Sequence, residues 1–317
     1  QKALQSLAAL HEEKAERALL ISATGTGKTY LSAFDVAAEK PKRILFIAHR
    51  KRILEASLRS FNTVLGDKYS YDIISAGNYR SSASCVFAMV STLVRHLDEF
   101  NPLEFDYIIV DESHRAGAES YRKVLSHFAP KFVLGMTATP QRGDNFDIFD
   151  LFNHIIAYRI TLQDALSEEM LTPFHYYGIA DMEIDGAKED NACFSRLTSQ
   201  ARVDHIIKKI QDYSVSKTDR RGLVFCSRND EARSLSDEFN KRGFKTKALS
   251  GNDSDDQRNR AIADLENGKL EYLFSVDIFN EGVDIPSINQ IIMLRPTESV
   301  IVFVQQLGRG LRKHENK

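Results

Sequence analysis

The sequence contains only three cysteines, Cys85, Cys193 and Cys226, among its 317 residues. They are far apart and odd in number, so they offer neither a disulfide framework nor a zinc site and predict a reducing, cytoplasmic location. The chain also lacks an apolar run of membrane-spanning length, a signal peptide at its start and internal repeats, so we expect no membrane partner. Tryptophan is absent as well, so any side chain that stacks on a nucleic-acid base must be Phe or Tyr.

The charges nearly cancel, with 42 Lys and Arg against 44 Asp and Glu and a formal net charge of −2. The molecule as a whole is therefore not a polycation, and any surface that binds nucleic acid must be local. A single hydrophobic core seldom grows beyond about 250 residues, so a chain of this length predicts two domains. The sequence starts without methionine and stops in a charged tail just past a motif, so we expect it to be part of a longer polypeptide.

Short apolar runs alternate with amphipathic stretches along the chain. The expected strands are 43–48, 85–90, 107–111 and 132–136 in the first half, and 222–226, 245–249, 272–276 and 288–294 in the second. The expected helices between them include 51–61, 231–242 and 255–267. Apolar strands separated by helices predict α/β domains whose mostly parallel sheets are covered on both faces. The pattern breaks around 146–191, which predicts a first domain at 1–158, a linker at 159–172 and a second domain at 173–317.

A glycine-rich segment, SATGTGKT at residues 22–29, follows an apolar run at 18–21 and precedes a helical pattern from Tyr30. The exposed N–H groups and positive helix end of such a strand–turn–helix unit attract phosphates. Lys28 can reach the β- and γ-phosphates of a nucleotide, and the Thr29 hydroxyl can bind magnesium. The strict pattern has glycine where Ser22 stands, and a turn that merely joins two elements is the plainer interpretation. The position of Gly-Lys-Thr between strand and helix favours an ATP or GTP site.

The segment IIVDESH at residues 108–114 places two acids at the end of an apolar strand. In a parallel sheet this end lies at the same edge as the phosphate-binding turn. The carboxylate of Asp111 can hold a magnesium ion, and that of Glu112 can orient and deprotonate the attacking water. Two acids after a strand also begin many loops, but the glycine-rich turn upstream favours a catalytic pair.

Two further segments contain groups suited to phosphoryl transfer. The first, GMTATP at 135–140, ends an apolar strand, and its hydroxyl groups can hydrogen-bond the acidic loop and relay the state of the nucleotide. The second, QQLGRGLR at 305–312, places Arg309 and Arg312 on one face of a helix. Planar guanidinium donors suit the charge that develops on a transferring phosphoryl group. A strand-to-turn exit and an exposed basic helix end are the plainer interpretations of these segments.

Taken together, these segments resemble the superfamily 2 helicases and translocases over nearly the whole chain. Residues 22–29 look like motif I, 47–50 like Ia, 90–93 like Ib, 111–114 like II, 137–140 like III, 223–227 like IV, 279–286 like V and 305–312 like VI. Residues 171–174, 276–286 and 294–297 are similar to bacterial restriction-enzyme motors, some of which follow a phospholipase-D-like nuclease domain. The resemblance implies two tandem RecA-like domains, each a mostly parallel sheet flanked by helices, with the nucleotide in the cleft between them.

The resemblance also implies a role for each residue that matches a motif. The catalytic residues would be Lys28, Asp111, Glu112 and two arginine fingers, Arg309 and Arg312. The nucleotide would be bound by Gln1, which would read the adenine, and by Thr24, Gly25, Thr26, Gly27, Lys28, Thr29, Gly282 and Asp284. The magnesium ion would be held by Thr29 and Asp111. Ser113 stands where the family more often has alanine, a small-for-small exchange that we expect to be tolerated.

Nucleic-acid contacts follow from the same resemblance, through backbone phosphates rather than through base sequence. The expected residues are His49, Arg50, Ser91 and Thr92 in the first domain and Ser227, Arg228, Ser250 and Gly251 in the second. A solvated helix start is the alternative for the basic run at 50–52. The residues expected to couple the nucleotide to the polymer are His114, Thr137, Thr139 and Gln305.

The sequence thus predicts an ATP- and magnesium-dependent helicase or translocase motor. The resemblance favours DNA over RNA, although the residues themselves do not distinguish the two. It also favours restriction-modification or DNA repair as the setting, with a fused or associated nuclease. A nucleic-acid-stimulated ATPase that clamps or signals without travelling carries the same motifs and stays open. A P-loop kinase would have no use for 137–140 or 305–312, and a nuclease centre lacks a convincing cluster of metal-binding carboxylates.

Overall fold

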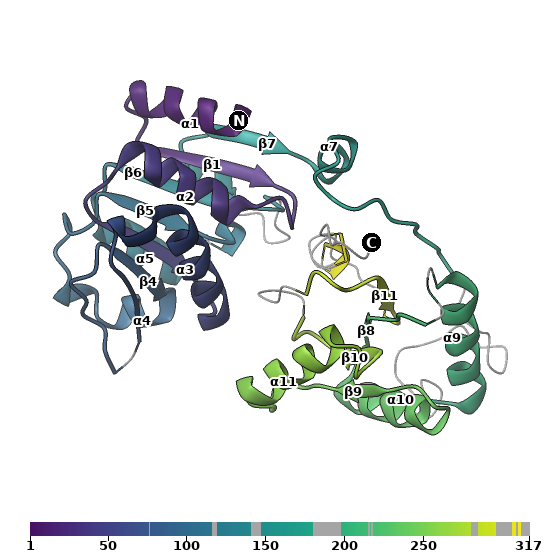
Figure 1. Cartoon of the computed structure of the whole chain (residues 1–317). Coiled ribbons are helices and arrows are strands. Elements are labelled where there is room, and N and C mark those ends of the chain that lie inside the picture. Colours follow the sequence, from purple (N-terminus) through teal and green to yellow (C-terminus); the bar gives the residue numbers. More distant parts are fainter. Residues whose placement is uncertain are drawn as a thin grey trace. The chain divides into compact units, whose positions relative to one another are not determined.

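The computed structural model describes residues 1–75, 77–115, 119–140, 147–179, 198–214, 216, 218–279, 285–295, 306–308 and 310–311. Contacts between residues divide the chain into two compact units, Gln1–Met170 and Leu171–Lys317 (Figure 1). Each unit contains one sheet with helices on both of its faces, so each is described by itself.

The first unit is built on a seven-stranded sheet. Its strands are β1 (Arg17–Ser22), β2 (Ile44–Ala48), β3 (Tyr71–Ile74), β4 (Cys85–Met89), β5 (Tyr107–Val110), β6 (Phe132–Thr137) and β7 (Ile156–Ile160). They lie in the order β3-β4-β2-β5-β6-β1-β7, and every adjacent pair is parallel. The carboxyl ends of β1, β5 and β6 therefore meet at one edge of the sheet, with β6 between the other two.

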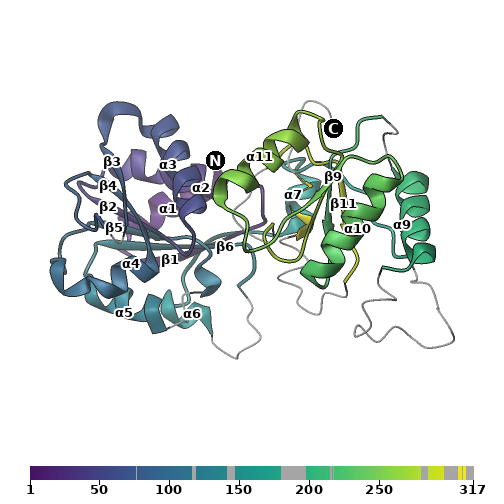
Figure 2. The ribbon, with the colours of Figure 1, turned by 90° about the horizontal axis from the view of Figure 1, so that it is seen from below.

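Helices cover both faces of this sheet and build a separate apolar core on each (Figure 2). One face carries α1 (Lys2–Glu12), α2 (Lys28–Glu39) and α3 (Lys51–Leu65), and the other carries α4 (Val90–Arg95), α5 (Glu119–His127) and α6 (Ile148–Leu151). The central strands β2 and β5 are buried along their whole length, as expected of parallel strands covered on both sides. The short helix α7 (Leu162–Ser167) follows β7 and begins with a capping box formed by Thr161 and Asp164.

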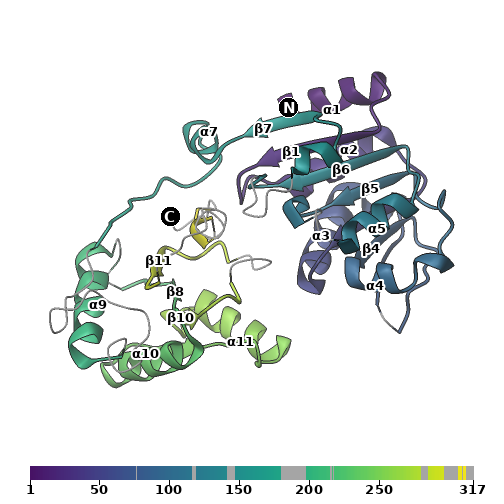
Figure 3. The same ribbon diagram turned by 180° about the vertical axis from the view of Figure 1, so that it is seen from behind.

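The second unit contains a four-stranded parallel sheet in the order β11-β8-β10-β9. The strands are β8 (Gly222–Phe225), β9 (Thr246–Ala248), β10 (Tyr272–Ser275) and β11 (Gln290–Met293). Side chains of α9 (Gln200–Tyr213) and α10 (Asn229–Lys241) form the core on one face, and those of α11 (Asp255–Glu266) form the core on the other. Figure 3 shows α9 next to α10 at one side of the strands. None of the helices in the described part of the chain combines the length and apolarity that a membrane crossing requires.

The prediction of two mostly parallel sheets flanked by helices is confirmed. All eight expected strands are present, and each of their ends lies within two residues of the expected one. The strands β3 and β7, at the two edges of the first sheet, were not predicted. Residues 159–172, which the sequence pattern assigns to a linker, include the last two residues of β7 and all of α7.

A close contact in the first unit joins β6 to the residue that follows α6. Gly135 in β6 lies against the ring of Phe152, which is fully buried, and a Cβ atom at Gly135 would lie 2.3 Å from the ring atom Cζ. No side chain larger than hydrogen fits there unless the ring moves. This contact holds the position of β6, the strand that ends at Thr137.

A buried polar cluster ties α1 to α2 and to the start of β5. The His11 ring lies 3.1 Å from the carboxylate of Asp35, and the Tyr107 hydroxyl donates to the same oxygen at 2.5 Å. Burial by itself would lower the pKa of His11, but the hydrogen bond and charge of Asp35, helped by the charge of Glu39, raise that pKa above its ordinary value of 6.5.

We expect the stability of the first unit to fall as pH rises through the pKa of His11. A pKa raised in the folded protein means that the imidazolium contributes stability in full below 6.5 and loses it as the ring deprotonates. Urea unfolding followed by circular dichroism from about pH 6 to about pH 8 measures the effect. The matched variant Asp35→Asn removes the charge that raises the pKa, so its stability should vary less with pH. Equal slopes for the two proteins would contradict the assignment.

Candidate nucleotide-binding site

The segment between β1 and α2 forms a tight turn at the carboxyl edge of the first sheet. Gly27 precedes α2 with a φ of 84°, a left-handed conformation that favours glycine. Lys28 is the first residue of the helix, and its ammonium donates to the carbonyl oxygens of Ser22 at 2.8 Å and Ala23 at 3.3 Å. The side chain is therefore folded over the turn, beside the N–H groups of the helix start that can bind phosphate.

Ser22, the departure from the strict glycine pattern, contributes a contact of its own. It is the last residue of β1, and its hydroxyl lies 2.5 Å from that of Thr26. The Thr26 hydroxyl also lies 2.7 Å from the carbonyl oxygen of Ala23, to which it donates. The two hydroxyl groups thus hold the ends of segment 22–26 together by hydrogen bonds within the turn. Sequence reasoning treated Ser22 only as a departure and missed this role.

The two acids that follow β5 have different environments. Asp111 is 9% exposed. Burial raises the pKa of its carboxyl to about 7, the negative charge of Glu112 adds to the rise, and the ammonium of Lys28 opposes it. The ends of β1 and β5 therefore bring Asp111 close enough to the turn for the charge of Lys28 to act on it. The positive charge of Lys28 does not fully compensate the negative charge of the buried carboxylate.

This environment fits a divalent cation. A buried carboxylate whose pKa is raised by burial and a neighbouring acid gains most from an added positive charge. The donors that the sequence assigns to the ion, the Thr29 hydroxyl and the Asp111 carboxylate, are both oxygen atoms, which magnesium prefers. These two residues are the ones that would hold it.

A chain of polar contacts runs from the second acid to the end of β6. Nδ1 of His114 lies 3.3 Å from a carboxylate oxygen of Glu112 and 3.2 Å from the Thr137 hydroxyl. That hydroxyl in turn accepts from the Thr139 N–H at 3.1 Å. Three of the residues expected to couple the nucleotide to the polymer, His114, Thr137 and Thr139, are thus brought together beside Glu112.

The other residues expected to bind nucleotide lie in different settings. Thr24 and Gly25 belong to the same turn and are partly exposed. Gln1 is exposed at the start of α1, which packs against α2 and β7. Five residues lie outside the described residues, so their predicted roles stay predictions; they are Gly282, Asp284, Gln305, Arg309 and Arg312.

The expected nucleic-acid contacts of the first unit follow β2 and β4. His49 and Arg50 lie between β2 and α3 and are partly exposed. Ser91 is exposed in the first turn of α4, whereas Thr92 beside it is only 4% exposed. The side chain of Ser91 is therefore better placed to meet a polymer than that of Thr92.

The expected contacts of the second unit follow β8 and β9 and are held by nearby carboxylates. The exposed guanidinium of Arg228 pairs with Asp230 at 2.7 Å. The N–H of Ser250 donates to the carboxylate of Asp253 at 2.6 Å, and Gly251 beside it is exposed. Both loops lie at the carboxyl edge of the sheet, where ligands bind in parallel α/β folds.

Comparisons with known proteins find helicase and restriction-enzyme families. Residues 1–142 match the family described as "Type III restriction enzyme, res subunit", and residues 201–314 match "Helicase conserved C-terminal domain". A 51.5 kDa protein of a Lactococcus phage (isolate 7-9) is 26% identical over 94% of this chain and 63% of its own length. The type I restriction enzyme EcoAI endonuclease subunit of Escherichia coli is 24% identical over 94% of this chain and 42% of its own length.

The fold has counterparts among solved structures. The ATP-dependent type ISP restriction-modification enzyme LlaBIII bound to DNA superposes on the whole chain with a TM-score of 0.72 at 19% identity, and the match covers 26% of that enzyme. The tandem RecA-like fold class is confirmed. With one of these matches in each unit, the chain is similar to the superfamily 2 helicases and translocases, and its first unit to the family of restriction-enzyme motors. It spans 63% and 42% of the two curated relatives named above.

Proposed function

We propose that the chain is the motor of an ATP-dependent helicase or translocase that acts on DNA with ATP and magnesium. The observation that carries the proposal is the set of polar groups gathered at one edge of the first unit's sheet. The ammonium of Lys28 lowers the pKa of Asp111 through its charge, and contacts lead from the neighbouring acid Glu112 through His114 to Thr137. A turn that merely joined a strand to a helix would not need catalytic-type acids and a relay beside it.

Each residue of the site has a defined task in this proposal. Lys28 exchanges its contacts with the turn carbonyls for the phosphates, and Thr29 and Asp111 hold the magnesium ion, which neutralises charge on the phosphates when bound. Glu112 orients the attacking water and takes its proton. His114 contacts both Glu112 and Thr137, so a proton or charge at Glu112 changes the hydrogen bonds at the end of β6.

DNA is proposed as the polymer because of the relatives. The printed names include a type I restriction enzyme endonuclease subunit and a restriction-modification enzyme bound to DNA. The longer relatives also suggest that a nuclease is fused to or associated with this motor. The domain boundaries proposed from the sequence, 1–158 and 173–317 with a linker at 159–172, leave one motor domain on each side of the connection.

We expect ATP hydrolysis to be slow without nucleic acid and to rise when DNA is added, because the predicted catalytic groups are divided between two units. Steady-state ATPase assays with increasing single-stranded DNA, double-stranded DNA or RNA measure the response. A longer protein that includes the flanking sequence is the control for a missing accessory domain. A rate that is indifferent to every polymer in both proteins would contradict a motor and indicate an ordinary NTPase.

Movement is tested separately, by displacement of a triplex-forming strand from DNA. A motor displaces the strand in a reaction that requires ATP hydrolysis. A clamp or signalling switch would show stimulated hydrolysis with no displacement, and that result would replace the motor by the switch.

A further inference from the structure

The second unit contains an ion pair in its interior. Arg202 of α9 is 1% exposed and Glu231 of α10 is fully buried, and Nη1 of the arginine lies 3.0 Å from Oε1 of the glutamate. Both side chains must be stripped of water to lie there, which costs several kcal/mol for each ion. Because of this cost, a gain in stability alone does not explain why both charged residues lie in the core.

The pair is linked to the carboxyl ends of two neighbouring strands. The second carboxylate oxygen of Glu231 accepts the N–H of Ser227, just after β8, at 2.8 Å. Nη2 of Arg202 donates to the carbonyl oxygen of Leu294, just after β11, at 3.4 Å. The Leu294 N–H donates back to β8, at the carbonyl oxygen of Phe225. The buried pair thus holds the backbone by hydrogen bonds at Ser227 after β8 and at Leu294 after β11.

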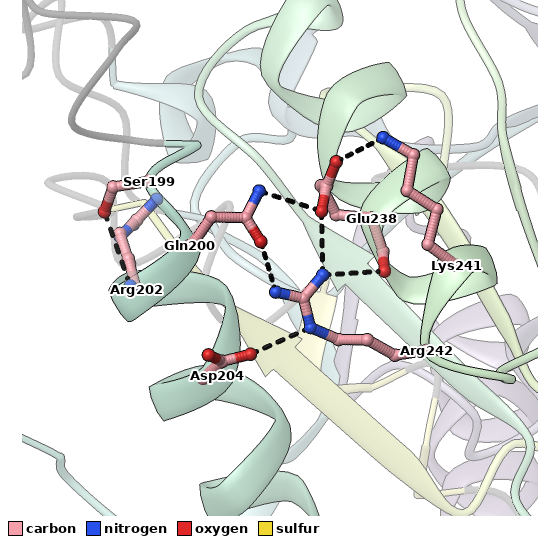
Figure 4. Close-up of polar contacts among 7 residues, drawn as sticks. All are labelled: Ser199, Gln200, Arg202, Asp204, Glu238, Lys241 and Arg242. Atoms are coloured by element: carbon pink, nitrogen blue, oxygen red, sulfur yellow. Dashed lines mark hydrogen bonds and ion pairs between the residues drawn. The ribbon is translucent and has the colours of Figure 1, made fainter.

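The helices themselves are held together by other contacts. A network on their outer side joins Gln200 and Asp204 of α9 to Glu238 of α10 and to Arg242, the residue that follows α10 (Figure 4). Arg242 lies 2.8 Å from Asp204 and 2.7 Å from Glu238. Apolar side chains of both helices also share one core. The buried pair is therefore not needed merely to attach α9 to α10.

We propose that Glu231, oriented by Arg202, is a positioning residue that fixes the backbone at Ser227 and Arg228 for contact with the phosphates of a nucleic-acid strand. The inference rests on the proposed function, in which these two residues grip the polymer. A loop whose N–H is already fixed loses less conformational freedom on binding, so its contacts give more affinity. A side chain that acts this way should alter the affinity for polymer and leave polymer-free ATP hydrolysis unchanged.

Two double variants separate this role from a structural one. Arg202→Met with Glu231→Met removes both charges at similar volume, an exchange that folded proteins often tolerate, and it also removes the acceptor for the Ser227 N–H. Arg202→Met with Glu231→Gln removes the charges but keeps an amide oxygen as acceptor. For each protein the measurements are the melting temperature, the polymer-free ATPase rate, and the DNA concentration that gives half-maximal stimulation.

The Met/Met protein is expected to need about fivefold to tenfold more DNA for half-maximal stimulation, the effect of one hydrogen bond. Its polymer-free rate should match that of the wild type, and the Met/Gln protein should return to near the wild-type DNA requirement. A wild-type DNA requirement in the Met/Met protein overturns the inference while the motor stands, and so does an equal defect in the Met/Gln protein. A wild-type protein that ignores DNA overturns the proposed function and the inference together.

Glu231→Asp serves if the Met/Met protein does not fold. The shorter side chain keeps a negative charge opposite Arg202 but withdraws the carboxylate from Ser227. The same rise in the DNA requirement is expected, and an unchanged requirement in a folded Glu231→Asp protein overturns the inference.

Discussion

The Glu112→Gln variant is expected to bind ATP with nearly wild-type affinity while its turnover falls by about a hundredfold to ten-thousandfold, the range that a general base contributes. Glutamine has the same size and can still contact His114, which lies 3.3 Å from the carboxylate in the wild type. It cannot take a proton from water. Asp111 and Thr29, the proposed ligands of the ion, are unchanged, so we expect magnesium and the phosphates to stay bound. Steady-state ATPase assays with saturating DNA, together with nucleotide titration calorimetry, measure both quantities.

Lys28→Ala is the comparison for this variant, because the turn then loses its cation and hydrolysis should be abolished through loss of phosphate binding and orientation. The two proteins should therefore differ in nucleotide affinity although both hydrolyse ATP poorly. A Glu112→Gln protein that hydrolyses ATP at the wild-type rate would show that another group activates the water.

The Arg309→Ala variant is expected to lose about a thousandfold or more in DNA-stimulated turnover, the effect of an arginine finger. A finger interacts most strongly with charge that develops in the transition state, so nucleotide affinity should change far less than the rate. Arg312→Ala should have a similar but milder effect, because spacing alone does not say which guanidinium lies nearer the γ-phosphate. Turnover under saturating ATP and DNA, compared with nucleotide affinity, is the measurement.

Arg233→Ala is the matched control, since this arginine is exposed on α10 and lies outside the segment 305–312. It removes the same charge from the same unit and should hydrolyse ATP normally. Normal turnover in both Arg309→Ala and Arg312→Ala, with DNA present, would leave the first unit as a self-sufficient ATPase and the second as an appendage that binds nucleic acid.

The parts of the fold that could be predicted are those with a strong local signal. Buried central strands such as β2 and β5 are apolar along their whole length, so their positions follow from the sequence. The edge strands are different. Only Ala157 and Ile160 are buried among the five residues of β7, without a regular alternation, and Ile74 is the one buried residue of the four in β3. Their pairing depends on neighbours far along the chain, which local patterns do not report.

The candidate site shows the same division. The turn at Lys28 and the acids after β5 are local motifs with a chemical reason for their spacing, and the structure brings them to one edge of the sheet. The contact of His114 with Thr137 joins two strand ends. The residues predicted that hydroxyl groups at 135–140 would hydrogen-bond the acidic loop, and the family resemblance then named His114 and Thr137 as coupling residues. The pairing of Arg202 with Glu231 had no signal in the sequence, because two charged residues on amphipathic helices look like solvated surface until the packing is known.

The packing of the Phe152 ring on Gly135 limits how this protein can diverge. Because a Cβ at position 135 would lie 2.3 Å from the ring of Phe152, a residue larger than glycine at 135 requires a side chain smaller than phenylalanine at 152. Either exchange alone is costly, one through a clash and the other through an empty space in the core. Among homologues the two positions should therefore change together, although 16 residues separate them in the sequence. A family alignment would record this contact as a correlated pair, one member of which lies in β6, the strand that ends at Thr137.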